Sequence, residues 1–531
     1  MNAFSKLMTG AALGLALVAS SGAVYAETPA NMLVIAHRID DITTLDPAES
    51  FEFAGSDVSR NVYQKLVNFD PLDLDAGYQP DVAESWTVSE DGKSITFTIR
   101  DGLTFHSGNP LTAEDVVFSL QRAVILNKTP AFILTQFGFT AENADQTIKA
   151  DGNTVTITTD QPYATSFVLN CLTSTIGGIV DKKTAMEHDK DGDLGNEWLK
   201  TNTAGSGAYS LVSWKPNESV TLKSNPGFYL GAPAMERVIV RHVQESASQR
   251  LLLERGDIDI ARNLNPEDVA GASSADGVKI ADELKGRLMY VSLNQKHPEL
   301  SKPQVRQAFK YLVDYEGMRD SFLKGQYTIH QNFLPKTYLG ASDDNPFTFD
   351  IEKAKALMNE AGVTEMEIEV GVREAQERIE IAQALQNAAA QVGIKMNITV
   401  GTAKQILARY RSRELDVYLG AWGPDYPDPQ TNAGTFAYNP DNSDEANATG
   451  LLAWRNAWDT DGLTAMTDAA VIENDKDKRA TMYEDIQSKF RDVSPFVVMF
   501  QQIEQSALRD NVKDFSTGQA ITSASYWQVT K

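Results

Sequence analysis

The residues best suited to chemistry lie in one loop, within the stretch YLGAWGPDYPDPQTN at positions 418–432. Two carboxylates, Asp425 and Asp428, stand there beside aromatic rings and among three prolines. Prolines restrict the loop before a ligand arrives, which lowers the entropy lost when a carboxylate is presented to a cation. The two acids also resemble the acid pair of a glycosidase, but three residues of separation in one loop do not place them on opposite sides of a scissile bond.

The elements that must position this loop follow an alternating pattern. The spacing of apolar residues predicts a strand at 366–372, a helix at 381–392, a strand at 394–400, a helix at 403–412 and a strand at 415–422. Such crossovers give a parallel sheet covered by helices, and its ligands bind beyond the carboxyl ends of the strands. The first strand ends at Arg373 and the third leads into Trp422 and Asp425. We therefore expect one basic and one acidic group on the same rim of the sheet.

The N-terminal half carries different signals. Asp91-Gly92, Asp101-Gly102 and Asp151-Gly152 are turn sequences between alternating segments, which predicts hairpins. Thr112 and Asp115 form a capping box at the start of a helix. This half is expected to be a mixed α+β layer. Farther along, residues 305–318 place apolar side chains on one helical face and predict a helix.

Length and charge exclude several classes of protein. A chain of 531 residues corresponds to about two to four domains. Its composition, 42% hydrophobic and 23% charged, is that of a folded soluble protein. The net charge of −24 argues against nucleic acid as a partner and against adhesion to anionic lipid.

The first 26 residues resemble a secretory signal peptide. Lys6 precedes a short apolar run, and Val24-Tyr25-Ala26 is a small-x-small cleavage site. The residue directly after the cleavage site is Glu27 and not a cysteine, so a lipid anchor is unsupported. The single cysteine, Cys171, excludes an internal disulfide and is expected to be a small buried residue. These features predict a soluble protein exported to a Gram-negative periplasm.

Signatures of catalysis and of metal binding are missing from the sequence. It has no G-x-S-x-G elbow, no phosphate loop of the G-x4-G-K-[ST] type and no H-E-x-x-H motif. The six histidines show no metal-ligand spacing. We therefore expect a binding protein rather than an enzyme, with no cofactor and no metal site, and keep a secreted hydrolase as a distant alternative.

The chain resembles the family 5 extracellular solute-binding proteins of ABC importers, which include dipeptide-, oligopeptide- and nickel-binding members. The resemblance covers nearly the whole chain after residue 26, and its most specific part is the stretch at 78–123. It is carried by TLDPAES (44–50), VYQKLVNFDP (62–71), YQPDVAESWTVSEDGKSITFTIRDGLTFHSGNPLTAEDVVFSLQRA (78–123), GSGAYSLVSWKPNESVTLKSNPGFY (205–229), LLLERGDIDIA (251–261), VSLNQKHPELSKPQVRQAFKYLVD (291–314), FDIEKAKALMNEAG (349–362) and the aspartate loop.

The resemblance implies an α/β fold of the two-lobed periplasmic-binding-protein type, in the large type II class with an extra subdomain. Mapped onto this sequence, lobe one would comprise residues 27–283 and 500–531, with the extra subdomain at about 70–200. Lobe two would comprise residues 284–499, and residues 1–26 would be the signal peptide.

The resemblance also implies roles for residues of the loop. In peptide-binding members the first Asp of this loop holds the α-ammonium of the ligand, and that position is Asp425 here. Trp422 would form a flat wall, Gly423 and Tyr426 are further candidate contacts, and Asp428 is expected to shape the loop.

A ligand carboxylate needs a cation, and the resemblance places Arg373 near the arginine of dipeptide binders. Arg378 follows closely, and Arg409, Arg411 or Arg413 could serve instead. In lobe one, the segment 47–55 would face the cleft. Its candidate contacts are Glu49, Ser50 and Phe51.

The implied function is capture of a small solute between two lobes that close over it, followed by delivery to inner-membrane ABC permease subunits with their ATPases. A short peptide or an amine-bearing amino-acid derivative is the preferred ligand. An opine, a sugar-phosphate conjugate, glutathione and a nickel chelate are alternatives. The protein is expected to be a monomer.

Overall fold

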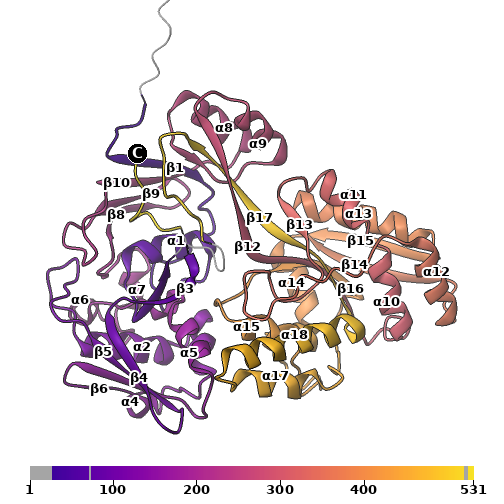
Figure 1. Ribbon diagram of the computed structural model, residues 1–531, viewed down its shortest axis with the longest axis horizontal. Coiled ribbons are helices and arrows are strands. Elements are labelled where there is room, and N and C mark those ends of the chain that lie inside the picture. Colours follow the sequence, from indigo (N-terminus) through magenta and orange to yellow (C-terminus); the bar gives the residue numbers. More distant parts are fainter. Residues whose placement is uncertain (1–26, 71–72, 519–523) are drawn as a thin grey trace, which may run out of the picture.

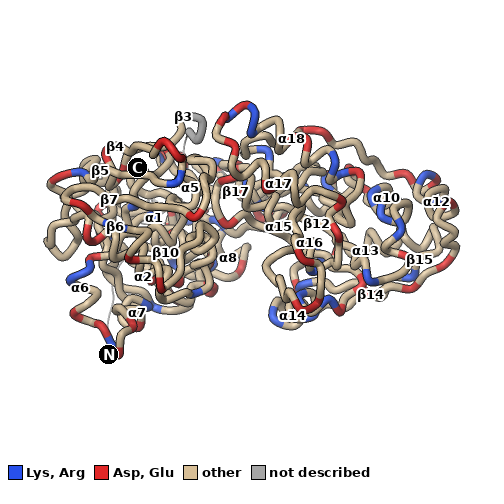
Figure 2. Tube along the Cα trace, turned by 90° about the horizontal axis from the view of Figure 1, so that it is seen from below, with Lys and Arg blue, Asp and Glu red and all other residues tan. Residues whose placement is uncertain are grey.

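The computed structural model describes residues 27–70, 73–518 and 524–531, so the expected signal peptide at 1–26 lies outside the described residues. Figure 1 shows two lobes side by side. Elements from β1 to α9 form the first lobe, and elements from α10 to α18 form the second lobe. Acidic and basic residues are interspersed over both lobes (Figure 2). Within the described parts of the chain, none of the helices is both long enough and apolar enough to cross a bilayer.

One continuous mixed sheet extends through both lobes. Its path runs β15-β14-β16-β12-β17-β11-β1-β10-β9-β8, and β13 pairs with β17 beside this path. In that order the strands are β15 (Ile394–Gly401), β14 (Met366–Arg373), β16 (Val417–Trp422), β12 (Val278–Leu293), β17 (Phe496–Arg509), β11 (Ile260–Ala261), β1 (Met32–His37), β10 (Arg237–His242), β9 (Ser219–Ser224), β8 (Tyr209–Lys215) and, beside them, β13 (Tyr327–Ile329).

The strands β12 and β17 cross between the lobes as an antiparallel pair (Figure 1). Their pairing is regular except for register shifts, the first of them between Leu284 and Leu288. Such irregularities bend and twist a strand pair locally. The lobe boundaries predicted at 283/284 and 499/500 fall inside these two strands. The division of the chain at those residues remains a prediction.

The parallel unit expected in the second lobe is present. β14 pairs in parallel with both β15 and β16, as the alternating sequence pattern predicted. Two helices connect these strands, α13 (Gln376–Ala390) and α14 (Ala403–Arg411). Because the strands are parallel, Arg373 at the end of β14 and Trp422 at the end of β16 lie on the same edge of the sheet.

The helix predicted at 305–318 is interrupted, so that prediction was wrong in its extent. The structure has α10 (Pro303–Tyr311) and a separate short helix α11 (Tyr315–Asp320). The carboxylate of Asp314 accepts a hydrogen bond from the backbone N–H of Gly317 and so starts the second helix. Side-chain competition of this kind ends a helix despite continuing apolar periodicity.

Two of the hairpins predicted in the N-terminal half are confirmed, those at Asp91-Gly92 and Asp151-Gly152, whereas Asp101-Gly102 is a turn that leads into an isolated bridge between Thr104 and Pro110. A four-stranded antiparallel sheet has the order β4-β5-β7-β6, with turns at Gly92 and Gly152 that adopt positive φ angles. The helix α2 packs beside this sheet and starts with the predicted capping box of Thr112 and Asp115. The elements of this region are β2 (Val67–Asp70), β3 (Asp73–Pro80), β4 (Ala83–Val88), β5 (Ser94–Ile99), α2 (Ala113–Leu126), α3 (Phe132–Thr135), α4 (Ala144–Thr147), β6 (Ile148–Asp151), β7 (Thr154–Thr158), α5 (Thr165–Leu172), α6 (Lys182–Glu187) and α7 (Asn196–Leu199).

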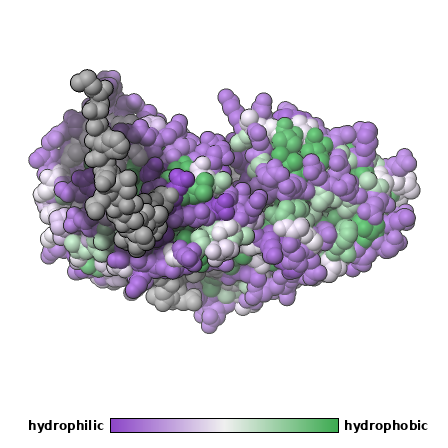
Figure 3. Space-filling view, turned by 90° about the horizontal axis from the view of Figure 1, so that it is seen from above, coloured by the Kyte–Doolittle hydropathy of each residue, from purple (hydrophilic) through white to green (hydrophobic). Residues whose placement is uncertain are grey.

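The remaining helices cover the sheet in both lobes. Apolar side chains between helices and strands are buried, while hydrophilic residues dominate the outer face and apolar residues form small patches on it (Figure 3). These helices are α1 (Phe53–Val62), α8 (Ser246–Arg255), α9 (Pro266–Ser273), α12 (Ile351–Glu360), α15 (Pro429–Phe436), α16 (Leu452–Arg455), α17 (Leu463–Val471) and α18 (Lys476–Val493).

Candidate ligand-binding site

A cavity of about 370 Å³ lies between the lobes. The first lobe contributes residues from the segments 50–69 and 173–176, and the second lobe contributes residues 421–425 and Pro427. Arg287 on β12 and Arg373 on β14 complete the wall. We call this space the interlobe cavity. Its size is in the range of cavities that hold small molecules.

A larger cavity of about 690 Å³ adjoins the interlobe cavity and shares Phe53 and Arg287 with it. Its buried charges are already paired, because Arg262 bonds to Asp57 and to Glu504. The charged side chains that line the interlobe cavity, in contrast, have no ion-pair partner among the described residues. We therefore take the smaller space as the candidate binding site.

The aspartate loop is fixed at both ends. It leaves β16 at Trp422 and enters α15 at Asp428, whose carboxylate accepts a hydrogen bond from the backbone N–H of Gln430. Arg479 donates two further hydrogen bonds to Asp428, at 2.9 and 2.8 Å. Asp428 thus shapes the loop, as expected from the sequence.

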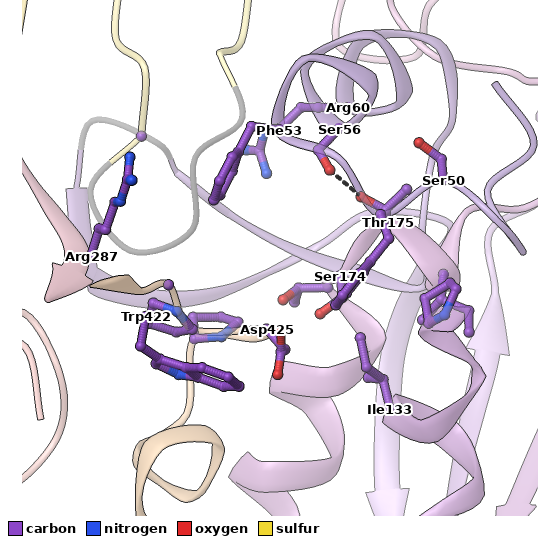
Figure 4. Close-up of a pocket in the computed structure, with 18 of the residues that line it drawn as sticks. Ser50, Phe53, Ser56, Arg60, Ile133, Ser174, Thr175, Arg287, Trp422 and Asp425 are labelled. Atoms are coloured by element: carbon purple, nitrogen blue, oxygen red, sulfur yellow. Dashed lines mark hydrogen bonds between the residues drawn. The ribbon is translucent and has the colours of Figure 1, made fainter. Parts of the chain in front are cut away.

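Asp425 lies in the wall of the interlobe cavity (Figure 4). Its backbone N–H donates to the hydroxyl of Thr431 at 3.0 Å. Within the part of the chain that the structure describes, its carboxylate has neither an ion pair nor a hydrogen-bond donor. Burial raises the pKa of Asp425 to about 7, against a weaker lowering effect of Arg455. A cationic group placed beside Asp425 would lower this pKa and restore the negative charge.

Trp422 both packs within the second lobe and faces the cavity. Its Nε1 donates to Asn432 Oδ1 at 3.3 Å, and its ring packs edge-on against Phe436. It also lines the interlobe cavity close to Asp425 (Figure 4). The ring is therefore held by the second lobe while presenting surface to a ligand. Gly423 also lines the cavity, and a side chain there would approach the ring of Phe53 at 3.4 Å.

Arg373 lines the same cavity at the end of β14. Its Nε is buried, and it has no hydrogen-bond partner among the described residues. The Arg373 side chain as a whole is half-buried, and a ligand carboxylate at this position would give the unpartnered N–H an acceptor. The sheet thus brings Arg373 and Asp425 to one cavity, as expected.

The other arginines that the sequence offered do not line this cavity. Arg409 forms two hydrogen bonds to Glu369, at 2.7 and 2.8 Å, and Arg413 bonds to Asp444 at 2.8 Å. Arg378 is 4% exposed and lies behind the wall, and Arg411 is exposed. Arg373 is the one of these five residues that contributes to the cavity wall.

Two predicted contacts lie elsewhere and are corrected here. Tyr426 is 4% exposed, packs against Phe167 and has its hydroxyl 3.3 Å from Gln136 Oε1. It points into the first lobe because successive residues of an extended loop face opposite sides, and Asp425 takes the side of the cavity. Glu49 accepts a hydrogen bond from Asn196 and is also absent from the cavity wall, whereas its neighbours Ser50 and Phe51 line it.

Several lining residues were missed by the sequence analysis. Arg60 and Lys65 flank the end of α1, and Arg287 lies on a strand between the lobes. Lys65 belongs to the VYQKLVNFDP stretch that carries the family resemblance, which was a usable signal. Ser174 and Thr175 follow α5 and show no sequence signal of their own.

The lobes also touch beyond the cavity. Asn170 of α5 donates to Asp428 at 2.9 Å, and the backbone N–H of Thr165 donates to Asn474 at 2.9 Å. The backbone N–H of Ala164 donates to the carbonyl of Val471. These bonds join α5 of the first lobe to α15, to the end of α17 and to the segment between α17 and α18 of the second, so the two lobes are in direct contact beside the cavity.

Comparisons with known proteins agree with this geometry. The family model described as "Bacterial extracellular solute-binding proteins, family 5 Middle" matches residues 77–444. The "Probable D,D-dipeptide-binding periplasmic protein DdpA" of Escherichia coli is 30% identical over 95% of each chain. "Heme-binding protein A" of Haemophilus influenzae is 25% identical and aligns over 86% of this chain and 84% of its own. The periplasmic binding protein DppA of Helicobacter pylori, solved with the peptide STSA, superposes with a TM-score of 0.78 over 94% of this chain and 98% of its own, at 22% identity. This chain belongs to the family 5 bacterial extracellular solute-binding proteins.

Proposed function

We propose that the protein is the periplasmic solute-binding component of an ABC importer and that it captures a short peptide or an amine-bearing amino-acid derivative. The observation that carries this proposal is that one cavity between two lobes is lined by the carboxylate of Asp425 and the guanidinium of Arg373. Neither group has an ion-pair partner among the described residues. A molecule with a free ammonium and a free carboxylate supplies one partner for each.

Binding in this site does not call for covalent chemistry. Asp425 would hold the ammonium, Arg373 would hold the carboxylate in bidentate fashion, and Trp422 would cover the apolar part of the ligand. A ligand that touches both lobes favours the closed arrangement over the open one, because it gains contacts in the closed state alone. The membrane-spanning permease subunits would then bind the closed form, and their ATPases would drive transport.

Several further features belong to the same proposal. The leader expected at residues 1–26 supports export to the periplasm, and the D,D-dipeptide-binding relative is itself named as periplasmic. A monomer suffices for binding, since both walls of the cavity come from one chain. The family consists of solute-binding proteins, which favours a receptor over a secreted hydrolase.

Calorimetric titration of the mature protein with Ala-Ala tests the proposal. Two blocked analogues, N-acetyl-Ala-Ala and Ala-Ala amide, each remove one charge from the ligand. We expect saturable binding of Ala-Ala and a loss of about 100-fold or more in affinity for the N-acetyl form, because Asp425 would lose its partner.

Variants assign the two ends of the ligand. Asp425→Asn should weaken Ala-Ala strongly, and Arg373→Gln should weaken Ala-Ala while changing the affinity of the amide little. Equal binding of all three ligands by the wild-type protein would contradict the proposal. So would conversion of any of them to a product.

A further inference from the structure

The charges around the interlobe cavity are strongly unequal. The described residues that line it include four cationic side chains and one acidic side chain. The whole chain has the opposite balance, with 72 acidic and 48 basic residues. A ligand with one ammonium and one carboxylate neutralises Asp425 and one cation, so most of this positive charge would remain unbalanced. The cations of the cavity are Arg60, Lys65, Arg287 and Arg373.

Two of these cations lie in the wall of the first lobe. Arg60 donates to the side-chain oxygen of Asn68 at 2.8 Å and to the carbonyl of Phe69 at 3.1 Å. Lys65 is 4% exposed, and its ammonium donates to the carbonyl of Thr173 at 2.6 Å. These partners are neutral. Neither cation forms an ion pair with any carboxylate in the described ranges of the chain.

Nearby carboxylates offset this charge only in part: burial lowers the pKa of Arg60 in spite of the charges of Asp81, Asp70 and Asp57, which raise it. The carboxylate of Asp81 is buried. Its two oxygens accept hydrogen bonds from the Gln64 amide at 2.7 Å and from the backbone N–H of Lys65 at 3.1 Å. Burial, reinforced by the charge of Arg60, lowers the pKa of Lys65 to about 7 in spite of Asp81. The positive charge in this wall is therefore destabilised, and an anion beside it would relieve the cost.

Unused hydroxyl groups accompany these cations. Ser50 is 0% exposed and Ser174 is 9% exposed, and both line the interlobe cavity. The hydroxyl oxygens of both are buried without a partner among the described residues. Thr175 donates to Ser56 in the same wall, at 3.2 Å (Figure 4). Hydroxyl donors beside cations form a site for an oxyanion, since each unsatisfied donor gains a hydrogen bond when the anion binds.

The two cations on the second-lobe side of the cavity form a separate group. Arg287 lies on β12 and Arg373 at the end of β14, and neither has an ion-pair partner within the described residues. Burial lowers the pKa of the neighbouring Arg378, and the positive charges of Arg287 and Arg373 lower it further. One ligand carboxylate can satisfy this group, which leaves the first-lobe pair for another anion.

We propose that the ligand carries two anionic oxygen groups besides its ammonium, as an acidic dipeptide or a related amphoteric acid does. This inference rests on the proposed function and specifies the chemical class of its ligand. The ammonium binds Asp425, one carboxylate binds Arg287 and Arg373, and the second anionic group binds Arg60, Lys65 and the free hydroxyls of the first lobe. A carboxylate and a phosphate ester share the chemistry that this wall recognises.

Matched ligands test the inference by calorimetric titration of the mature protein at pH 7. Two pairs differ by one acidic group at nearly constant shape, Ala-Glu with Ala-Gln and Glu-Ala with Gln-Ala. A third pair, Ala-phosphoserine with Ala-Ser, differs by the phosphoryl group. We expect the acidic member of at least one pair to bind about tenfold more tightly or better, the gain expected from charge-assisted hydrogen bonds. The pair that shows the preference identifies the anion as carboxylate or phosphate.

Variants assign the preference to the first-lobe wall. Arg60→Gln should reduce the acidic preference, which is the ratio of the affinities for the two members of a pair, to about threefold or less. Lys65→Gln should do the same, and because Lys65 is buried, Arg60→Gln decides the question if Lys65→Gln fails to fold. Arg241→Gln removes an exposed charge on β10 and should leave the preference intact, which controls for net charge.

The possible outcomes separate this inference from the proposed function. If the neutral members bind as tightly as the acidic ones, the inference is overturned and the proposed function stands. If the preference survives in Arg60→Gln and Lys65→Gln, the assignment to the first-lobe wall is overturned. If no dipeptide of either kind binds, the proposed function fails, and the inference fails with it.

Discussion

Asp428 and Arg479 form a bidentate ion pair in which both side chains are almost fully buried, 0% and 1% exposed. Asp425 precedes Asp428 by three residues and has no such partner within the described chain. One loop therefore holds an acid whose charge is neutralised inside the protein and an acid whose charge is left for a ligand. Asp428 therefore has a structural role and Asp425 is available for binding, although the two residues look alike in the sequence.

Removing one partner of the buried pair should destabilise the protein. Arg479→Met leaves Asp428 charged and unpaired in the interior, so we expect the free energy of unfolding to fall by about 3–5 kcal/mol. Urea denaturation followed by circular dichroism measures this change. Arg319→Met breaks a surface pair with Asp320, whose side chains are 36% and 67% exposed, and should not change stability measurably. Equal effects of the two substitutions would contradict a structural role for Arg479.

Asp425 should make the unliganded protein less stable as the pH rises. Burial raises the folded-state pKa of Asp425 to about 7, above its ordinary value of 3.8, so the folded protein binds more protons than the unfolded chain between these values. The contribution of Asp425 to the free energy of unfolding is fully present below about pH 4 and is lost as the pH rises towards 7. In Asp425→Asn this pH-dependent loss of stability should be absent.

Urea unfolding of the wild-type protein and of Asp425→Asn from pH 4 to pH 8 measures the effect. We expect the stability of the variant relative to wild type to increase by about 1–3 kcal/mol over this range. Comparing the two proteins cancels the contributions of all other titrating groups. A constant difference would mean that the pKa of Asp425 is the same in the folded and the unfolded protein.

Binding of an amine ligand should release a proton at low pH. At pH 6 free Asp425 is mostly protonated, while an ammonium beside it requires the carboxylate, so the proton leaves when Ala-Ala binds. Below pH 7 we expect the affinity to fall by up to about tenfold per pH unit. Titrations in two buffers of different ionisation enthalpy count the released protons. At pH 8.5 no proton should be released; a proton should instead be taken up, because the α-amino group of Ala-Ala, with an ordinary pKa of about 8, is then mostly neutral and must bind as the ammonium.

The contact between Asn170 and Asp428 should favour the closed arrangement of the lobes. Asn170→Ala removes a hydrogen bond to a buried carboxylate that Arg479 still neutralises, so the fold should persist. We expect the unliganded variant to show a larger radius of gyration in X-ray scattering and about threefold to tenfold weaker ligand binding. Asn387→Ala on the exposed face of α13 should change neither quantity. An unchanged radius of gyration in Asn170→Ala would remove this contact from the account of closure.

The aspartate loop and the strands around it could be predicted from the sequence because their determinants are local. The alternation in 366–422 specifies strands and helices, and the carboxyl edge of a parallel sheet follows from that order. Arg373 and Asp425 therefore met in the cavity as predicted. The break before α11 was missed because one side chain, Asp314, outweighs the apolar periodicity around it.

The first-lobe wall could not be predicted in the same way. Arg60, Lys65 and Ser174 come together with the aspartate loop only when two distant parts of the chain are packed against each other. The position of Tyr426 could not be predicted for the same reason. Its place between the two aspartates suggested contact with the ligand, but its side chain contacts Phe167 and Gln136 of the first lobe.

The hydrogen-bonded ladder of β12 and β17 belongs to both halves of the molecule at once. If one half unfolds, it breaks backbone hydrogen bonds of a strand that also belongs to the other half. Heating should therefore give one calorimetric transition instead of two, and proteolytic nicking within this ladder should not release either half as a stable fragment.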